Sequence, residues 1–138
     1  MTHYWLMKSE PFKYSWQQLL RDKRTHWDGV RNHQAANNLK AMQLGDRAFF
    51  YHSNEGMEIV GLAEIARTAY PDPSDETGKF VMVDIKPVTS AAAPLTLAAI
   101  KADPKLAEMQ LLRQSRLSVS SVTAAEFKHI CKRLGIKA

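Results

Sequence analysis

Four stretches of the sequence place polar side chains beside aromatic or apolar ones. They are residues 8–10 (Lys-Ser-Glu), 27–32 (Trp-Asp-Gly-Val-Arg-Asn), 51–53 (Tyr-His-Ser) and 116–118 (Arg-Leu-Ser). Each lies where a predicted strand or helix begins or ends, and ligand-binding groups usually converge on such connections. A flat aromatic ring with carboxylate, amide and hydroxyl partners suits a planar heterocycle such as a nucleobase. Each stretch alone can also be structural, with Trp27 in the core and Arg31 as a solvated charge.

No motif in the sequence supports catalysis. Glycine-rich phosphate-binding loops of the Walker or GxGxxG type are absent. The histidines lack the HxxxH or HExxH spacing of metal sites, although a metal site assembled across the fold stays an alternative; they are His3, His26, His33, His52 and His129. Ser9 and Glu10 are adjacent on a strand and therefore point to opposite faces, with no serine-elbow motif around them. We predict a protein without catalytic residues, cofactor or metal.

The composition is that of a globular protein. The chain has 138 residues, of which 45% are hydrophobic and 24% charged, which excludes a disordered or fibrous chain. No segment approaches the roughly 20 apolar residues of a membrane span, and the N-terminus lacks the features of a signal peptide. Cys131 is the single cysteine, which excludes an internal disulfide and predicts a reducing, cytoplasmic environment.

The chain is moderately basic. Lysine and arginine number 19 against 14 acidic residues, a formal net charge of +5, and the pI is about 9.4. A basic excess favours a polyanionic partner, because contacts to phosphates release counterions. Solubility alone also requires a net charge of this size, so charge leaves the choice of partner open.

Hydrophobic periodicity predicts a mixture of strands and helices. The expected strands are residues 4–7, 47–53, 58–70, 79–88 and 116–119. Four helices are expected. Two of them begin after Ser15 and Thr123, each of which opens a capping-box sequence. The other two cover residues 32–42, with Asn32 as a possible N-cap, and residues 95–102. In the last helix a core-facing stripe includes Cys131, which we expect to be inert core filler. Gly61 marks a bulge or a close backbone approach.

The order of these elements predicts an α+β fold. They do not alternate as regular βαβ units, so we expect several antiparallel strands curled into a small barrel with helices packed around it. No repeat or linker divides the sequence, which predicts one domain over residues 1–138. No coiled-coil or exposed apolar stripe is evident, so a monomer is expected.

The same polar stretches resemble the EVE-domain family. The resemblance is carried by residues 4–11 (YWLMKSEP), 27–35 (WDGVRNHQA), 49–54 (FFYHSN), 59–62 (IVGL), 69–73 (AYPDP) and 116–119 (RLSV). It runs in order from residue 4 to about residue 134. It implies a PUA-like barrel, related to YTH and ASCH modules, that reads modified bases in DNA or RNA without a catalytic cofactor.

The resemblance also implies a set of pocket residues. They are Lys8, Ser9 and Glu10 from the first strand, Trp27, Val30, Arg31 and Asn32 from the following turn and helix start, Tyr51, His52 and Ser53 from the next strand, and Arg116 and Ser118. Trp27 is expected to stack on a base or to form a wall. Glu10, Ser9, Asn32 and Ser118 are expected at the polar edge of the base. Arg31, Lys8 and Arg116 are expected at phosphates or base acceptors.

The sequence departs from the family pattern at several positions. Ala36 stands where many relatives have arginine, His33 where tyrosine is common, and Ser120 where glutamine is common. The connector over residues 73–80 is shorter than in typical members. Ala36 removes a contact that the arginine of relatives is expected to make with the nucleic-acid backbone. The short connector lacks the length that a ligand-contacting loop has in those relatives.

These observations lead to three ranked hypotheses. The first is a nucleic-acid-binding reader that accepts one everted base, a modified cytosine, in an aromatic and polar pocket. The second is a small-molecule binder that uses the same pocket for a base, a nucleoside or another metabolite. The third, an enzyme acting on modified nucleotides, has no supporting motif. Neither the modification nor the choice between DNA and RNA follows from the residues.

Overall fold

The computed structural model describes residues 2–136. Along the chain the elements are β1 (Tyr4–Ser9), α1 (Trp16–Asp22), β2 (Thr25–Trp27), α2 (His33–Ala41), β3 (Arg47–His52), β4 (Glu58–Pro71), β5 (Val81–Thr96), α3 (Leu97–Ala102), the 3-10 helix η1 (Pro104–Leu106), α4 (Gln110–Arg113), β6 (Val119–Val122) and α5 (Ala124–Leu134). The α+β class predicted from the sequence is confirmed.

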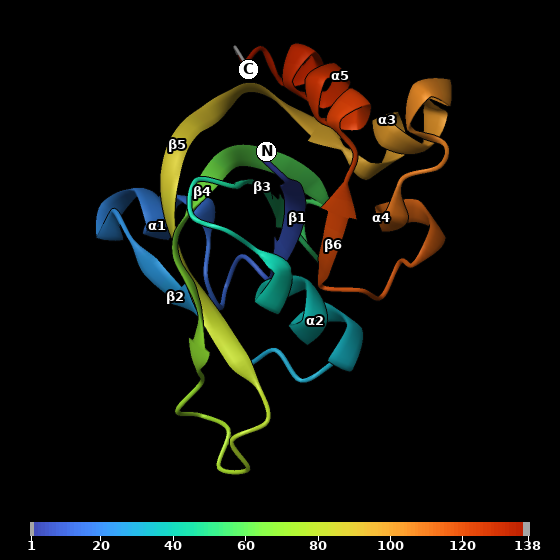
Figure 1. The fold of residues 1–138 in the computed structure, drawn as a ribbon. Helices are drawn as coiled ribbons and strands as arrows, with labels where there is room; N and C mark the ends of the chain where they lie inside the picture. Colours follow the sequence, from blue (N-terminus) through green and yellow to red (C-terminus); the bar gives the residue numbers. More distant parts are fainter. Residues whose placement is uncertain (1, 137–138) are drawn as a thin grey trace.

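All of these strands belong to one mixed sheet. The sheet has six strands in the order β2-β5-β4-β3-β1-β6, and every neighbouring pair is antiparallel except β1 and β3. The parallel pair arises because the connection between β1 and β3 carries α1, β2 and α2. The sheet curls strongly, with the long strands β4 and β5 bending around the other strands (Figure 1). Register shifts along the β4–β5 ladder accompany this curvature, as β-bulges do.

Side chains on the two faces of the sheet belong to two separate hydrophobic cores. The first core combines one face with α1 and α2 and contains Trp16 and Phe50. The second combines the other face with α3, α4 and α5 and contains Phe49 and Phe127. Phe49 and Phe50 are both fully buried although adjacent, because successive strand residues point to opposite faces. The strand apolar on both faces, predicted over residues 47–53, is therefore confirmed.

Two helix starts match their sequence signals. Asn32 caps α2, its side chain accepting a hydrogen bond from the backbone N–H of Ala35. Thr123 and Glu126 form a complete capping box at the start of α5. The predicted helices over residues 32–42 and 95–102 correspond to α2 and α3.

Gly61 also fulfils its prediction. It lies at a register shift of the β4–β5 pair, and the indole ring of Trp16 packs directly against its backbone. A Cβ at this position would overlap Trp16 Cε2 and Cζ2, so only glycine leaves room for the ring.

Other local predictions are wrong in detail. Only one of the two hydrogen bonds of the Ser15 capping box forms: Ser15 Oγ accepts from the backbone N–H of Gln18. The Gln18 side chain does not bond to the Ser15 backbone and instead donates to Asp22. Residues 116–118 precede β6, which begins at Val119, because the last ladder partner of β6 on β1 is Met7. The strand expected over residues 79–88 continues to Thr96, where it follows the curvature of β4.

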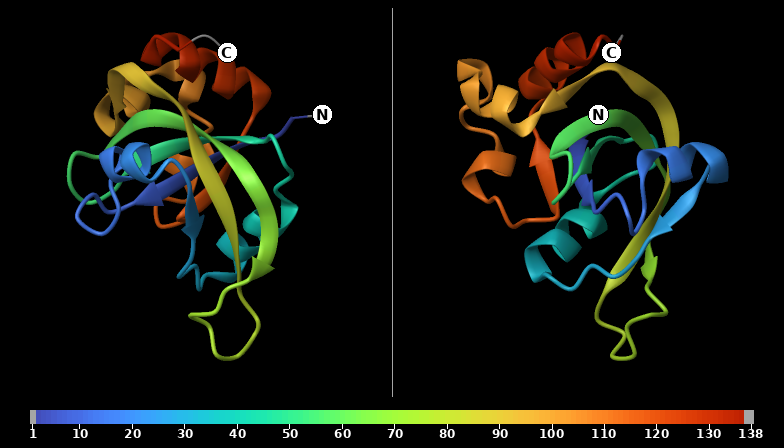
Figure 2. Two further views of the ribbon diagram at one scale, coloured as in Figure 1. Left: turned by 90° about the vertical axis from the view of Figure 1, so that its left-hand side faces the viewer. Right: turned by 180° about the vertical axis from the view of Figure 1, so that it is seen from behind.

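The short elements β2, η1 and α4 were not predicted. Each has only three or four residues, too few to show a hydrophobic period. The hairpin loop between β4 and β5 extends away from the rest of the molecule in both views of Figure 2. No helix within residues 2–136 is long and apolar enough to cross a membrane.

Candidate functional site

An open cavity of about 1090 Å³ lies where the ends of several elements meet. We refer to it as the main cavity. Its lining comes from residues 8–10 at the end of β1, 25–31 between α1 and α2, 53–54 after β3, and Ser115, Arg116 and Ser118 before β6, with Lys13, Tyr14 and Asp22 from around α1. The four polar stretches identified in the sequence therefore border one space.

The structure brings together most of the predicted site residues. Those that line the main cavity are Lys8, Ser9, Glu10, Trp27, Val30, Arg31, Ser53, Arg116 and Ser118. Asn32, Tyr51 and His52 do not line it. Asn32 is occupied as the N-cap of α2, and Tyr51 is buried in the second core, with part of its surface in a neighbouring cavity.

His52 has a structural role at the start of α1. Its Nε2 accepts a hydrogen bond of 3.0 Å from the backbone N–H of Trp16, and its side chain is buried. Burial lowers the pKa of His52, although the charge of Glu58 acts in the opposite direction. The neutral ring, which accepts this hydrogen bond, is thus the favoured form. His52 was expected to bind a base, but its side chain does not line the main cavity.

Trp27 is mainly a core residue that also contributes to the cavity wall. It is 8% exposed and packs edge-to-face on Phe50, with 5.5 Å between ring centroids. Its strand β2 pairs with β5, so Trp27 lies opposite Val83 and is held rigidly. Only a small part of the indole surface faces the cavity. Of the two roles expected for Trp27, this geometry suits the wall.

Ser9 and Glu10 form a fixed polar edge at the end of β1. Ser9 Oγ donates a hydrogen bond of 2.6 Å to the carbonyl of Tyr14. The Glu10 carboxylate accepts a hydrogen bond of 2.6 Å from Asn54 Nδ2 and pairs with Lys13 at 3.4 Å. A carboxylate held in this way is an oriented acceptor for an amine or amide N–H.

Lys8 joins β1 to the segment before β6. Its backbone N–H donates to the carbonyl of Ser118 at 2.9 Å, and its Nζ donates to the carbonyl of Ser115 at 2.7 Å. Partial burial lowers the pKa of the Lys8 ammonium. This single hydrogen bond leaves two of the three ammonium N–H groups available to an anion.

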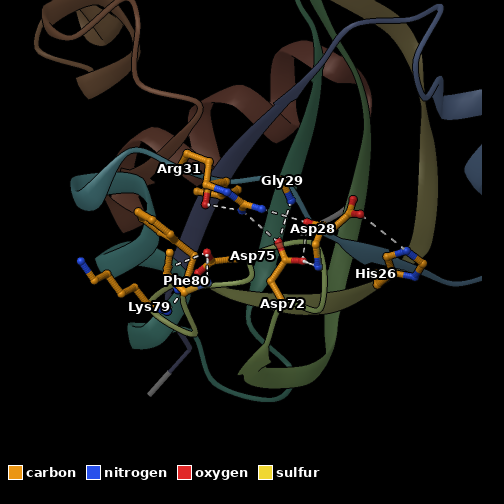
Figure 3. A network of polar contacts seen from close by, with 11 residues as sticks. His26, Asp28, Gly29, Arg31, Asp72, Asp75, Lys79 and Phe80 are labelled. Atoms are coloured by element: carbon orange, nitrogen blue, oxygen red, sulfur yellow. Dashed lines mark hydrogen bonds and ion pairs between the residues drawn. The ribbon is translucent and has the colours of Figure 1, made fainter.

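Arg31 is held by the loop between β4 and β5. Its Nη1 lies 3.2 Å from Asp72 Oδ2, its Nη2 donates to Ser74 Oγ at 2.9 Å, and its guanidinium lies over the ring of Phe80 at 5.5 Å. Figure 3 shows the Asp72 carboxylate directed toward both Arg31 and Gly29, and the backbone N–H of Gly29 donates to the same carboxylate oxygen at 2.8 Å. The hairpin loop thereby fixes the segment that carries one wall of the main cavity.

The Asp72 side chain is completely buried and ionised. Burial by itself raises the pKa of Asp72, but hydrogen bonds from Ser74, Gly29 and Arg31 outweigh it and lower the pKa to about 2. A second aspartate, Asp75, closes the loop by accepting hydrogen bonds from Thr77 and from the backbone N–H groups of Lys79 and Phe80. The β4–β5 loop and residues 29–31 are thus joined into one hydrogen-bonded unit.

Several lining residues were not among the predicted pocket residues, although Asp28 and Gly29 belong to the stretch 27–32 identified in the sequence. They are Lys13, Tyr14, Asp22, Thr25, His26, Asp28, Gly29, Asn54 and Ser115. Tyr14 and Asp22 meet through a hydrogen bond of 2.8 Å across α1. Asn54 directly follows the predicted stretch 51–53, so proximity in sequence could have included it. Tyr14 and Asp22 had no such signal, because their approach depends on the fold of the first core.

Other candidate chemistry is not assembled. Within residues 2–136 no group of three or more His, Cys, Asp or Glu side chains is arranged to hold a metal ion. Cys131 is buried in the second core, as predicted, and burial raises the pKa of its thiol to about 11. A thiol with such a pKa is protonated at neutral pH and therefore unreactive.

A curled six-stranded sheet flanked by helices, with a polar cavity at its strand ends, defines a PUA-like α+β fold. The model of the EVE domain family matches residues 3–133. The chain belongs to the EVE domain family.

Related proteins extend this assignment over nearly the whole chain. Thymocyte nuclear protein 1 of Rattus norvegicus is 38% identical, and the match covers 94% of this chain and 73% of the rat protein. The solved structure of Rpa0253 from Rhodopseudomonas palustris is 57% identical with a TM-score of 0.92, covering 97% of this chain and 94% of that one. Human THYN1, solved in complex with DNA containing 5-methylcytosine, is 35% identical with a TM-score of 0.90, covering 99% of this chain and 100% of that one.

Proposed function

We propose that this protein is a non-catalytic nucleic-acid-binding module that accommodates one flipped, modified cytosine in the main cavity. The observation that carries the proposal is its similarity to human THYN1, solved with DNA containing 5-methylcytosine, over the whole length of both chains. The main cavity supplies a place for the base, since four separated polar segments border it. In this proposal the chain acts as a single-domain monomer in the cytoplasm.

The geometry favours particular partners for each part of a nucleotide. The oriented carboxylate of Glu10 suits the exocyclic amine of cytosine, which is a hydrogen-bond donor. Trp27 and Val30 supply apolar wall surface, and both are largely buried. Arg116 and Lys8 are the cations placed to meet phosphate, whereas Arg31 is already held by Asp72 and Ser74.

The energetics set a limit on selectivity. Extruding a base from a duplex costs a few kcal/mol, which contacts in the cavity must return. A methyl group on the base adds apolar contact of about 1 kcal/mol. Discrimination between 5-methylcytosine and cytosine is therefore expected to be about tenfold or less.

The first experiment compares binding of oligonucleotides that differ only in the modification. DNA and RNA strands carrying one central 5-methylcytosine or cytosine are titrated into the protein and followed by fluorescence anisotropy. We expect measurable binding and a preference of several-fold for one modified strand. Equal affinity for all strands would remove the reader function, and no binding to any strand would remove nucleic-acid binding altogether.

The second experiment locates the site. Arg116→Ala is expected to weaken binding about fivefold, because it removes a cation from the cavity lining. Arg113→Ala is the matched control, since Arg113 is exposed and lines a different cavity. Trp27→Ala is less suitable, because it removes a ring from the first core. Identical losses in the Arg116 and Arg113 variants would contradict the assignment to the main cavity.

A further inference from the structure

A second cavity, of about 450 Å³, adjoins the main cavity. The two share Lys8, Ser53, Asn54 and Ser115 in their linings, so these residues form a common boundary. Beyond it, the second cavity is lined by residues near the end of β3, in the loop before β4, and in α3 and α4. It is large enough for a small ligand group of its own.

The second cavity differs from the main cavity in charge. Its lining contains two lysines, Lys8 and Lys101, and no aspartate or glutamate among the described residues. The main cavity carries both signs of charge, since Glu10, Asp22 and Asp28 line it together with Lys8, Lys13, Arg31 and Arg116. A polyanionic strand that leads from the main cavity into the second cavity therefore meets lysines and no carboxylate in the described lining of the second cavity.

The remaining lining of the second cavity is apolar and partly open. Met57 is 45% exposed, and Leu97 and Leu112 are partly buried beside it. Such a surface suits the face of a heterocycle, which gains free energy by leaving water for an apolar wall. Lysines beside an apolar wall suit a single strand, because the cations meet its phosphates and the wall covers the face of a base.

Lys8 connects the two cavities. Its ammonium is anchored to the carbonyl of Ser115 at 2.7 Å and lies 5.9 Å from the ring centroid of Tyr51, a residue of the second cavity. The anchor fixes the charge on the boundary itself. A phosphate that links a nucleotide in one cavity to a nucleotide in the other must pass this boundary.

We propose that the second cavity binds the nucleotide adjacent to the flipped base, with its base against Met57 and Leu112 and the strand backbone contacting Lys8 and Lys101. This inference rests on the function proposed above, because it requires a nucleic-acid strand in the main cavity. The minimal ligand is then a single-stranded segment longer than one nucleotide.

The test uses ligands of two lengths. The whole chain is titrated with 5-methyldeoxycytidine monophosphate and with a trinucleotide that carries 5-methylcytosine at its centre. Lys101→Ala is expected to weaken trinucleotide binding about three- to tenfold and to reduce the salt slope by about 0.7, the value for one phosphate contact on a single strand. Binding of the monophosphate is expected to be unchanged. Lys128→Ala, an exposed lysine on α5, is the matched control and is expected to change neither.

A second variant tests the apolar wall. Met57→Glu places a carboxylate in the second cavity at an exposed position and is expected to weaken the trinucleotide alone, by about tenfold. If the wild type binds the trinucleotide and both variants bind it equally well, the inference is overturned while the proposed function stands. If the wild type binds neither ligand nor longer strands, the proposed function fails and the inference with it. Tighter binding of an acidic peptide than of the trinucleotide would also overturn the inference.

Discussion

The side chains of the main cavity divide into those already held by the protein and those free to meet a ligand. Glu10 and Ser9 are hydrogen-bonded within the site, and Arg31 is bound to the β4–β5 loop. Side chains fixed before binding lose little conformational entropy when a ligand arrives. Arg116 is exposed and lines the same cavity, so its ordering by a ligand has an entropic cost. The held groups therefore favour specificity, and the exposed cation contributes mainly charge.

One residue carries an unsatisfied polar atom. Ser120 is fully buried beneath the second core, and its Oγ has no hydrogen-bond partner within the described part of the chain. Ser120→Ala is expected to raise the free energy of unfolding by about 1 kcal/mol, because a buried hydroxyl without a partner is destabilising. Urea denaturation measures the change.

The adjacent residue provides the control for this variant. Ser121 is exposed and its Oγ donates to Gln110 Oε1 at 3.2 Å, so Ser121→Ala is expected to change stability by less than about 0.5 kcal/mol. A clear loss of stability in Ser120→Ala would show that its hydroxyl has a partner in solution.

Asp72 gives a prediction with a defined pH dependence. Asp72→Asn removes a buried carboxylate that pairs with the partly exposed Arg31 and is expected to lower the free energy of unfolding by about 2 kcal/mol at pH 7. The folded-state pKa of about 2 lies below the unfolded value. The stabilisation by the carboxylate is therefore complete above about pH 4 and is lost as the pH falls through 2.

The measurement is urea denaturation of wild type and variant at pH 7 and pH 3. The difference between them is expected to shrink by about 1 kcal/mol at pH 3, since the unfolded state then takes up a proton that the folded state does not. Asp28→Asn, at an exposed position in the same segment, is the control and is expected to be nearly neutral. A gap that stays constant with pH would show that folding does not lower the pKa of Asp72.

At the scale of elements, the sequence was informative wherever a residue type has one dominant local use. Capping residues before α2 and α5, and the glycine within β4, were located in advance. Asn32 and His52 show the limit, because a polar side chain at an element end can serve either a ligand or the helix beside it. Their hydrogen bonds to α2 and α1 were decided by tertiary placement. The strand β2 was missed because its ladder partner lies almost sixty residues later, in β5.

The contact between β4 and α1 provides the prediction at this scale. Gly61→Ala is expected to lower the free energy of unfolding by about 2–3 kcal/mol, because the new methyl group overlaps the Trp16 ring. The ring has no easy escape, since its Nε1 donates to Ser90 Oγ at 2.8 Å. Thermal and urea unfolding measure the loss.

A double-mutant cycle isolates this contact from a general effect of alanine in a strand. In a Trp16→Phe background the smaller ring does not reach the new methyl group, so Gly61→Ala is expected to cost less than half as much. Equal losses in both backgrounds would show that the close approach does not limit stability.

For the whole molecule, fold and charge act together. The curled sheet gathers segments from both ends of the chain at one cavity, so its charged side chains come from several segments that are far apart in the sequence. The net charge of +5 is modest, so long-range attraction alone gives little selectivity. Recognition then depends on where the charges lie: carboxylates and cations together in the main cavity, Lys8 at its boundary with the second cavity, and Lys101 within the second cavity.

Salt dependence distinguishes this arrangement from a site for a free nucleoside or metabolite. If Lys8, Arg116 and Lys101 each contact a phosphate of a single strand, the affinity for an oligonucleotide is expected to fall about tenfold to twentyfold between 50 and 200 mM salt. The affinity for neutral 5-methyldeoxycytidine is expected to change little, because no counterions are released. Calorimetric titrations of both ligands across this range provide the comparison. An oligonucleotide affinity as insensitive to salt as that of the nucleoside would instead indicate a small-molecule site, in which the phosphates of the strand make no contact with the protein.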